Sequence, residues 1–272
     1  MSKNIWRLII DAASDQYYNM AVDEAIAKST GNDKALPTLR FYRWNPPTLS
    51  LGYFQKFEKE VDPRMCQLNN IGIVRRITGG RAVLHDDEIT YSLSIPSSNP
   101  IFQKDLITSY KMIAEALAEG LKLLNLSPSF NQKKLPSEHS SAACFDAPSL
   151  YELTISGKKI IGSAQKRFQN SFLQHGSIPF SINAEKLFNC FKIDNKELKN
   201  RLINNFKNTA TGINDELGVK ISVERAINAF IKGFEKVFSI DFIQEKINLY
   251  ESELVEKELY QKYSSEEWLK KY

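Results

Sequence analysis

The chain has 272 residues, of which 42% are hydrophobic and 25% charged, and its net charge is +4. A chain of this length can bury a sizeable core, either as one large domain or as one domain with a small appendage. The sequence has no run of about 18 apolar residues and no dense basic tract with interleaved aromatic residues. We therefore expect neither a membrane-spanning segment nor a nucleic-acid partner.

The cysteine content argues against structural disulfides and metal sites. Cys66, Cys144 and Cys190 are scattered along the chain, their number is odd, and no CxxC motif occurs. Neither a disulfide framework nor a zinc site is expected from such a pattern. The N-terminal residues 1–16 are typical of a first strand and not of a signal peptide. We expect a cytoplasmic protein with reduced thiols.

Strand-like and helix-like segments alternate in the first half of the chain. Residues 16–29 predict a helix capped by Asp15. A second helix is expected over 107–124, where apolar side chains recur at spacings of three and four. A short helix is expected at 62–69. The expected strands are 5–10, 39–44, 49–54, 73–78, 82–85 and 89–95, with turns at Asn45-Pro46-Pro47, Gly79-Gly80 and Asp86-Asp87.

The second half begins with a long loop rich in Ser and Pro at 127–148, and long loops in compact domains are often functional. A hairpin then turns at Gly157, and residues 172–180 continue as a strand. After about residue 182 the pattern is mainly helical, so we expect a domain at 1–215 and a helical extension at 216–272, which can pack on the same domain. Short turns between strands favour an α+β fold with a mixed, largely antiparallel sheet flanked by helices.

The first candidate for chemistry is the segment RRITGGRAVLH at 75–85. Its glycines would let the backbone approach a ligand closely. A hairpin that merely needs a positive φ at Gly79 or Gly80, with solvated arginines, explains the pattern equally well. The segment matches neither GxGxxG nor GxxxxGK[ST], so no nucleotide-binding loop is predicted.

Cys144 and Lys159 are the next candidates. Cys144 lies in a loop of small residues, whereas Cys66 and Cys190 have the apolar neighbours of core thiols. A cation such as Lys159 would favour the thiolate form of a nearby cysteine and could polarise a carbonyl. An inert buried thiol and a surface lysine remain the alternatives for these two residues.

The histidines and one acidic pair complete the candidates. His139 is a rival base for Cys144 by proximity in sequence, and His175 is expected in the sheet core or the pocket. Asp23 and Glu24 are adjacent on a predicted helix, so they point about 100° apart and do not suggest a catalytic dyad.

These segments together resemble the lipoate/biotin protein ligase and octanoyltransferase superfamily. The likeness begins at Asn19-Met20-Ala21 and Asp23-Glu24, and it covers roughly residues 5–185. It continues through WNPP (44–47), SLG (50–52), RRITGGRAVLHDDEITYS (75–92), AACFDAP (142–148), the segment Gly157–Gln165, QHGSI (174–178) and KYSSEEW (262–268). The Cys-bearing AACFDAP followed by KxxGSAQ is similar to the LipM-type octanoyltransferases.

The resemblance implies a function in lipoate biosynthesis and protein lipoylation. Such enzymes move an octanoyl group from octanoyl-acyl carrier protein to a lipoyl domain, typically the glycine cleavage H protein, without cofactor or ATP. Cys144 then becomes the nucleophile that carries a thioester intermediate, and Lys159 stabilises the thiolate and the oxyanion. Arg75, Arg76 and Arg81 would also steer the acidic carriers. The implied acyl-binding residues are Arg75, Gly79, Gly80, Arg81, His85, Gly162, Ser163, Ala164 and His175.

Three alternatives stay open at this point. An ATP-dependent lipoate–protein ligase would use Lys159 but would not need Cys144. An amidotransferase of the same superfamily would also use the cysteine, but it would take the acyl group from an acylated lipoyl domain. A non-catalytic acyl-binding module would keep the pocket without transferring anything, which the presence of both Cys144 and Lys159 disfavours.

Overall fold

The computed structural model describes residues 4–131 and 152–272. Within these residues the strands form one sheet of eight strands, in the order β11-β1-β2-β6-β10-β9-β8-β7, and a sheet of three strands, in the order β4-β3-β5. In the large sheet β1 pairs in parallel with β2 and β11, and the other pairings are antiparallel. The predicted α+β fold with a mixed, largely antiparallel sheet is confirmed.

Most elements of the first half lie close to where the sequence places them. Asp15 caps helix α1 through its side chain, as expected, by accepting from the backbone N–H groups of Tyr17 and Tyr18. The elements are β1 (Asn4–Ser14), α1 (Gln16–Gly31), β2 (Thr38–Trp44), β3 (Thr48–Leu51), α2 (Phe57–Glu60), α3 (Pro63–Leu68), β4 (Gly72–Arg75), β5 (Val83–His85), β6 (Glu88–Pro96), α4 (Leu106–Leu123) and β7 (Ser129–Asn131).

The second half adds the long strands β9 and β10 and the helices α5 to α11. Its hairpin turns at Ser156-Gly157, where Gly157 has a φ of +81°, as the sequence predicts. The elements are β8 (Glu152–Ile155), β9 (Lys158–Arg167), β10 (Ser171–Pro179), α5 (Ala184–Asn189), α6 (Lys196–Thr209), α7 (Ile213–Leu217), α8 (Val223–Phe238), β11 (Ile240–Gln244), α9 (Leu249–Leu254), a π-helical turn (Val255–Leu259), α10 (Tyr260–Ser264) and α11 (Glu266–Leu269).

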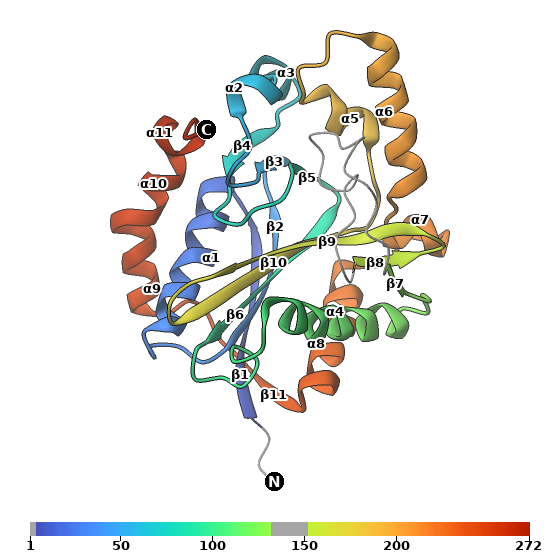
Figure 1. Cartoon of the computed structure of the whole chain (residues 1–272). Coiled ribbons are helices and arrows are strands. Elements are labelled where there is room, and N and C mark those ends of the chain that lie inside the picture. The colour runs from blue at the N-terminus through green and yellow to red at the C-terminus, as the bar shows by residue number, and fades with distance from the viewer. Residues whose placement is uncertain (1–3, 132–151) are drawn as a thin grey trace.

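The large sheet has two differently covered faces (Figure 1). Helices α4 and α8 pack against each other and bury an apolar core on one face, which includes Phe41, Leu93 and Phe230. Helix α1 covers the other face and is itself backed by the C-terminal helices through Leu259 and Tyr263. The small sheet sits at the end of this second face, so the space between the two sheets opens there.

Two expectations about the connections are wrong. The segment around Gly79-Gly80 is not a hairpin, because β4 and β5 do not pair with each other but flank β3 on opposite sides. The expected extension 216–272 is not purely helical, because residues 240–244 form strand β11, which pairs in parallel with β1 at the edge of the large sheet. Both errors arise because strand partners distant in the sequence determine the pairing.

No helix among the described residues is long and apolar enough to cross a membrane.

Candidate acyl-binding site

A pocket lies between the two sheets, and the empty space within it, including the part open to solvent, is about 350 Å³. Its lining combines apolar and aromatic side chains with a few buried polar groups. The lining residues are Met20, Tyr42, Trp44, Ser50, Arg76, Val83, His85, Thr90, Gly162, Ser163, Ala164, His175, Gly176 and Ser177.

The floor of the pocket consists of two adjacent rows of cross-strand partners. One row runs across four strands through Tyr42, Thr90, Ser177 and Gly162, each paired with the next. The neighbouring row runs through Arg40, Ser92, His175 and Ala164. Side chains on one face of a sheet alternate with those on the other, so this floor is set by register. Small residues at the β9 end of both rows leave room above the backbone.

Gly176 contributes only its backbone to the pocket, because it lies between His175 and Ser177 and pairs with Tyr91 of the core under α4 and α8. A Cβ at this position would lie 2.6 Å from the carbonyl oxygen of Gly162 and 2.7 Å from Oγ of Ser163. Both distances are far below van der Waals contact. The close approach of β9 and β10 here therefore requires glycine.

The glycine segment (residues 76–82) connects β4 to β5, and Arg76 is its one residue in the pocket lining; Gly79 and Gly80 are not part of that lining. Gly80 has a φ of +91°, a conformation that favours glycine. A Cβ on Gly52 would lie 1.8 Å from the carbonyl oxygen of Gly80, so the segment can pack on β3 only where residue 52 has no side chain. This is a close approach between two backbone segments, and the predicted approach of the Gly79-Gly80 backbone to a ligand stays a prediction.

Arg76 shapes this segment from inside. Its guanidinium donates to the carbonyl oxygens of Ser50, Gly79 and Arg81 at 2.8, 2.9 and 2.7 Å, and to Oγ of Ser50 at 3.1 Å. Only 4% of Arg76 is exposed. The expectation that it steers a carrier is therefore wrong, because its donors bind the backbone of the loop.

Arg75 points away from the pocket, because neighbouring residues on β4 face opposite sides. Its guanidinium is fully buried and donates to the backbone carbonyl oxygens of Gly52, Tyr53, Gln55, Trp268 and Leu269. The geometry thus contradicts its expected place among the acyl-binding residues and its expected role in steering carriers. Arg75 instead joins α11 to the loop after β3.

Arg81 lies in the glycine segment, but its side chain is not part of the pocket lining. Its Nη1 is buried and, among the described residues, has no hydrogen-bond partner.

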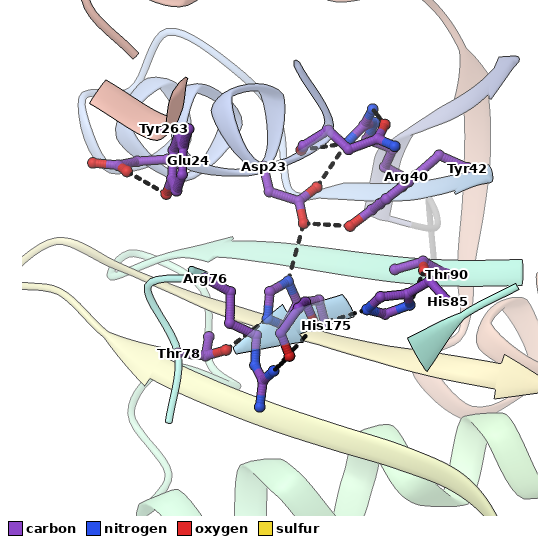
Figure 2. A network of polar contacts seen from close by, with 12 residues as sticks. Asp23, Glu24, Arg40, Tyr42, Arg76, Thr78, His85, Thr90, His175 and Tyr263 are labelled. Atoms are coloured by element: carbon purple, nitrogen blue, oxygen red, sulfur yellow. Dashed lines mark hydrogen bonds and ion pairs between the residues drawn. The ribbon is translucent and has the colours of Figure 1, made fainter. Parts of the chain in front are cut away.

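His175 stands at the centre of a buried polar network below the glycine segment (Figure 2). Its Nδ1 lies 3.0 Å from Oδ2 of Asp23, and its Nε2 lies 2.6 Å from Oγ1 of Thr78. Asp23 also accepts from Arg40 and from the hydroxyl of Tyr42, both at 2.8 Å. All these groups are buried, so the network links α1, the large sheet and the glycine segment.

The network determines the charges of its members. Burial alone would raise the pKa of Asp23, but the hydrogen bond from His175 and the charge of Arg40 outweigh it and hold that pKa below its ordinary value. Burial lowers the pKa of His175, and the opposing effect of Asp23 is too small to restore it. Asp23 is therefore ionised and His175 neutral near pH 7.

His85 enters the pocket lining from β5 of the small sheet. Its Nε2 lies 2.8 Å from Oγ of Ser50, and its Nδ1 lies 3.3 Å from a carboxylate oxygen of Glu88. Trp44 stacks on the imidazole with 4.3 Å between the ring centroids. The imidazole is thus held by the indole of Trp44 and by two polar groups, and it lines the pocket in this orientation.

Lys159 lies on the pocket side of β9 because of a register shift. Thr154 of β8 pairs with Lys159, whereas Leu153 pairs with Ile161, so Ile160 is an extra residue. Ile160 and Ile161 consequently both enter the apolar core, and Lys159 shares a face with Gly162. Its ammonium, on a side chain that is 5% exposed, forms an ion pair with the equally buried Glu152.

Three predicted site features remain to be placed. Gly162, Ser163 and Ala164 line the pocket, and Lys159 stands three to five residues before them on the same strand. Cys144 and His139 lie outside the described residues. Among the described residues, no group of three or more metal-ligating side chains lies close enough together to hold a metal ion.

Sequence reasoning missed several residues that build this site. Asp23 was set aside because it and the adjacent Glu24 do not suggest a catalytic dyad, and Arg40, Tyr42, Trp44 and Thr78 received no role. Their partners lie between 17 and 152 positions away in the chain, so no local spacing reveals them. The one available signal was the resemblance at Asp23-Glu24 itself.

The arrangement is that of a domain built to hold a slender, mostly apolar group beside buried polar residues. The catalytic-domain family of lipoyl protein ligases A and B matches residues 15–235. A lipoate protein ligase from Thermoplasma acidophilum, a bipartite enzyme, superimposes with a TM-score of 0.82 at 27% identity, covering 98% of this chain and 97% of that one. A lipoate-protein ligase A structure with bound ATP gives a TM-score of 0.77 at 27% identity, covering 99% of both chains.

The sequence relatives are closer still. Octanoyltransferase LipM of Clostridioides difficile is 45% identical over 98% of this chain and 99% of its own. Octanoyltransferase LipM of Geobacillus kaustophilus is 43% identical with the same coverage. The chain therefore belongs to the lipoyl protein ligase A/B family and, within it, to the LipM-type octanoyltransferases.

Proposed function

We propose that the protein transfers an octanoyl group from octanoyl-acyl carrier protein to a lysine of a lipoyl domain, in the cytoplasm and as part of lipoate biosynthesis. The expected acceptor is the glycine cleavage H protein. The full-length identity of 45% to an octanoyltransferase carries the proposal. The pocket is compatible with it, because Met20, Trp44 and Val83 offer an apolar wall to an alkyl chain.

The reaction needs two acyl transfers. The thiolate of Cys144 attacks the carbonyl carbon of the donor thioester, a C–S bond forms, and the carrier leaves as a thiolate that takes up a proton. The neutral amine of the acceptor lysine then attacks the acyl-cysteine, an amide bond forms, and the amine gives up a proton as the Cys144 thiolate leaves. No ATP is required, since the donor thioester is already activated.

Lys159 is proposed to stabilise the negative charge that develops in both steps. An ammonium at a buried site acts more strongly on an oxyanion or thiolate than it would in water. The position of Lys159 on the pocket face of β9 supports this role, and so does its burial. Glu152 would hold the ammonium in place between the two steps.

The acyl chain is proposed to lie over the floor formed by Gly162, Ala164 and Ser177, beneath the glycine segment. His85 and His175 both line this space. Both rings are held by hydrogen-bond partners, so their edges present fixed surfaces to the chain. The assignment of Gly79 and Gly80 to acyl binding rests on the resemblance and on their position in the segment that carries Arg76 into the pocket lining.

An ATP-dependent lipoate–protein ligase is the alternative function that has an observation in its favour. The similar solved structures are lipoate ligases, one of them with bound ATP, at 27% identity over nearly the whole chain. The higher identity to LipM-type enzymes favours transfer from a carrier. An amidotransferase that uses an octanoylated lipoyl domain as donor remains distinguishable by donor choice.

The test compares donors in the wild type and in a Cys144→Ala variant. Each protein is incubated with the apo H protein and one of three donors: octanoyl-acyl carrier protein, octanoylated H protein, or lipoate with ATP. We expect octanoylation of the acceptor lysine from the carrier protein alone, and its loss in the variant. Full activity of Cys144→Ala with lipoate and ATP would establish the ligase instead, and a preference for octanoylated H protein would establish the amidotransferase.

A further inference from the structure

The pocket is assembled from two parts, and a short hydrogen bond joins the glycine segment to the pocket floor. The floor belongs to the large sheet, while the glycine segment is carried by the small sheet. Oγ1 of Thr78, next to Gly79, lies 2.6 Å from Nε2 of His175, although the two residues are 97 positions apart. Thr78 is fully buried, so water cannot replace this contact easily.

The chemistry of the partners fixes the direction of this bond. An ionised Asp23 can only accept, so the proton of the neutral imidazole stays on Nδ1, 3.0 Å from the carboxylate. Nε2 is then left with a lone pair, and the Thr78 hydroxyl donates to it. Arg40 and Tyr42 donate to Asp23 at 2.8 Å and hold the carboxylate in the orientation that His175 needs.

We propose that Asp23 is a positioning residue for the acyl-binding pocket. Through the tautomer of His175 it fixes Thr78 (Figure 2), and Thr78 fixes the position of the adjoining Gly79 and Gly80. Asp23 itself is not in the pocket lining, whereas His175 is. The link to acyl binding rests on the proposed function; the link to the geometry of the glycine segment does not.

The neighbouring carboxylate provides a matched control. Glu24 follows Asp23 on α1 and is 6% exposed, against 1% for Asp23. It accepts from Lys262 and Tyr263 of the C-terminal helices, each at 2.6 Å, on the side of α1 away from His175. We call the hydrogen-bonded chain Asp23–His175–Thr78 the relay. A variant of Glu24 therefore disturbs a buried carboxylate of the same helix without changing a member of the relay.

The first experiment needs no activity. Amide hydrogen exchange of the peptide spanning 76–82 is measured in the wild type, Asp23→Asn, Thr78→Val, Thr78→Ser and Glu24→Gln. We expect exchange about tenfold faster in Asp23→Asn and Thr78→Val, which corresponds to the loss of a hydrogen bond of about 1.4 kcal/mol. Thr78→Ser keeps the hydroxyl and should resemble the wild type, as should Glu24→Gln. Unchanged exchange in Thr78→Val would overturn the proposal, whatever the enzyme's substrate.

The second experiment uses octanoyl-acyl carrier protein as donor. In both relay variants we expect KM for the donor to rise about tenfold while kcat falls less. The double variant Asp23→Asn/Thr78→Val should be no worse than the poorer single variant, because both changes break one relay. Fully additive losses would show that Asp23 acts elsewhere. If exchange is faster in the relay variants but the wild type transfers no octanoyl group, the proposed function is refuted and the structural role of Asp23 still holds.

Discussion

The two faces of the large sheet are both buried, yet they are built from opposite kinds of residue. Under α4 and α8 the strands present Leu39, Phe41 and Leu93, which contribute through apolar burial alone. On the other face the same strands present Arg40, Thr90 and Ser92, together with His175 of β10. Every polar group on that face needs a partner, since an unpaired buried polar group costs about 1–3 kcal/mol. The first face holds the fold together, and the second face holds a pocket.

The first way to sharpen this comparison is to remove the cation of the pocket face. Lys159→Ala should reduce octanoyl transfer about a thousandfold, because the developing negative charge loses its stabilisation. Lys158→Ala is the matched control, since Lys158 precedes it on β9 and faces the other way. Single-turnover transfer from octanoyl-acyl carrier protein measures the effect. Equal losses in both variants would contradict the assignment.

A core substitution on the apolar face should lower stability and leave KM unchanged. Phe230 is fully buried between α4 and the sheet, with its ring centroid 6.5 Å from that of Phe41. Phe230→Ala should lower the free energy of unfolding by about 3–5 kcal/mol, because it leaves a cavity. Urea denaturation measures the loss. KM per folded molecule should stay unchanged, and a large rise in KM would mean that the two faces are not independent.

A single methyl group tests the close approach of β9 and β10. Gly176→Ala places a Cβ 2.6 Å from the carbonyl oxygen of Gly162, so β9 and β10 must shift apart where Gly162 forms part of the pocket floor. We expect a loss of about 1–3 kcal/mol in stability by thermal unfolding, together with weaker donor binding. Gly157→Ala is the comparison, because a Cβ there meets nothing and only the positive φ is strained. An unchanged KM in Gly176→Ala would place the acyl chain elsewhere.

The smallest expected effect is a pH dependence that comes from His175. The pKa of His175 is lowered by burial, with Asp23 opposing and Arg76 and His85 adding to the shift. The folded protein thus keeps it neutral, while the unfolded chain takes up a proton below about pH 6.5. Stability should therefore fall as the pH drops below that value. Denaturation between about pH 7 and about pH 5 should show a shallower fall in His175→Gln; parallel curves would show that His175 is not buried as a neutral ring.

Local patterns in the sequence predicted most elements of the fold but not their partners. The cap at Asp15, the hairpin at Gly157 and the helix over 107–124 follow from signals within a few residues. Strand β11 was missed because only its parallel pairing with β1, more than 200 positions away, makes it a strand. The placement of β4 and β5 on either side of β3 was missed for the same reason.

The candidate site shows the same limit. Gly162, Ser163 and Ala164 could be identified from the resemblance, and His85 and His175 came with them. Arg75 and Arg76 could not be told apart, since both precede the glycines and only strand alternation separates their directions. Asp23 was set aside because its relation to His175 exists only in the folded chain.

The central claim is that an octanoyl group passes through Cys144, and the intact mass of the protein tests it most directly. The wild type and Cys144→Ser are incubated with octanoyl-acyl carrier protein, without acceptor and without ATP. We expect an octanoyl adduct on the wild type that hydroxylamine removes, as for a thioester, and no such adduct on the variant. The absence of any adduct on the wild type, in a preparation that still octanoylates the H protein, would contradict the acyl-enzyme mechanism.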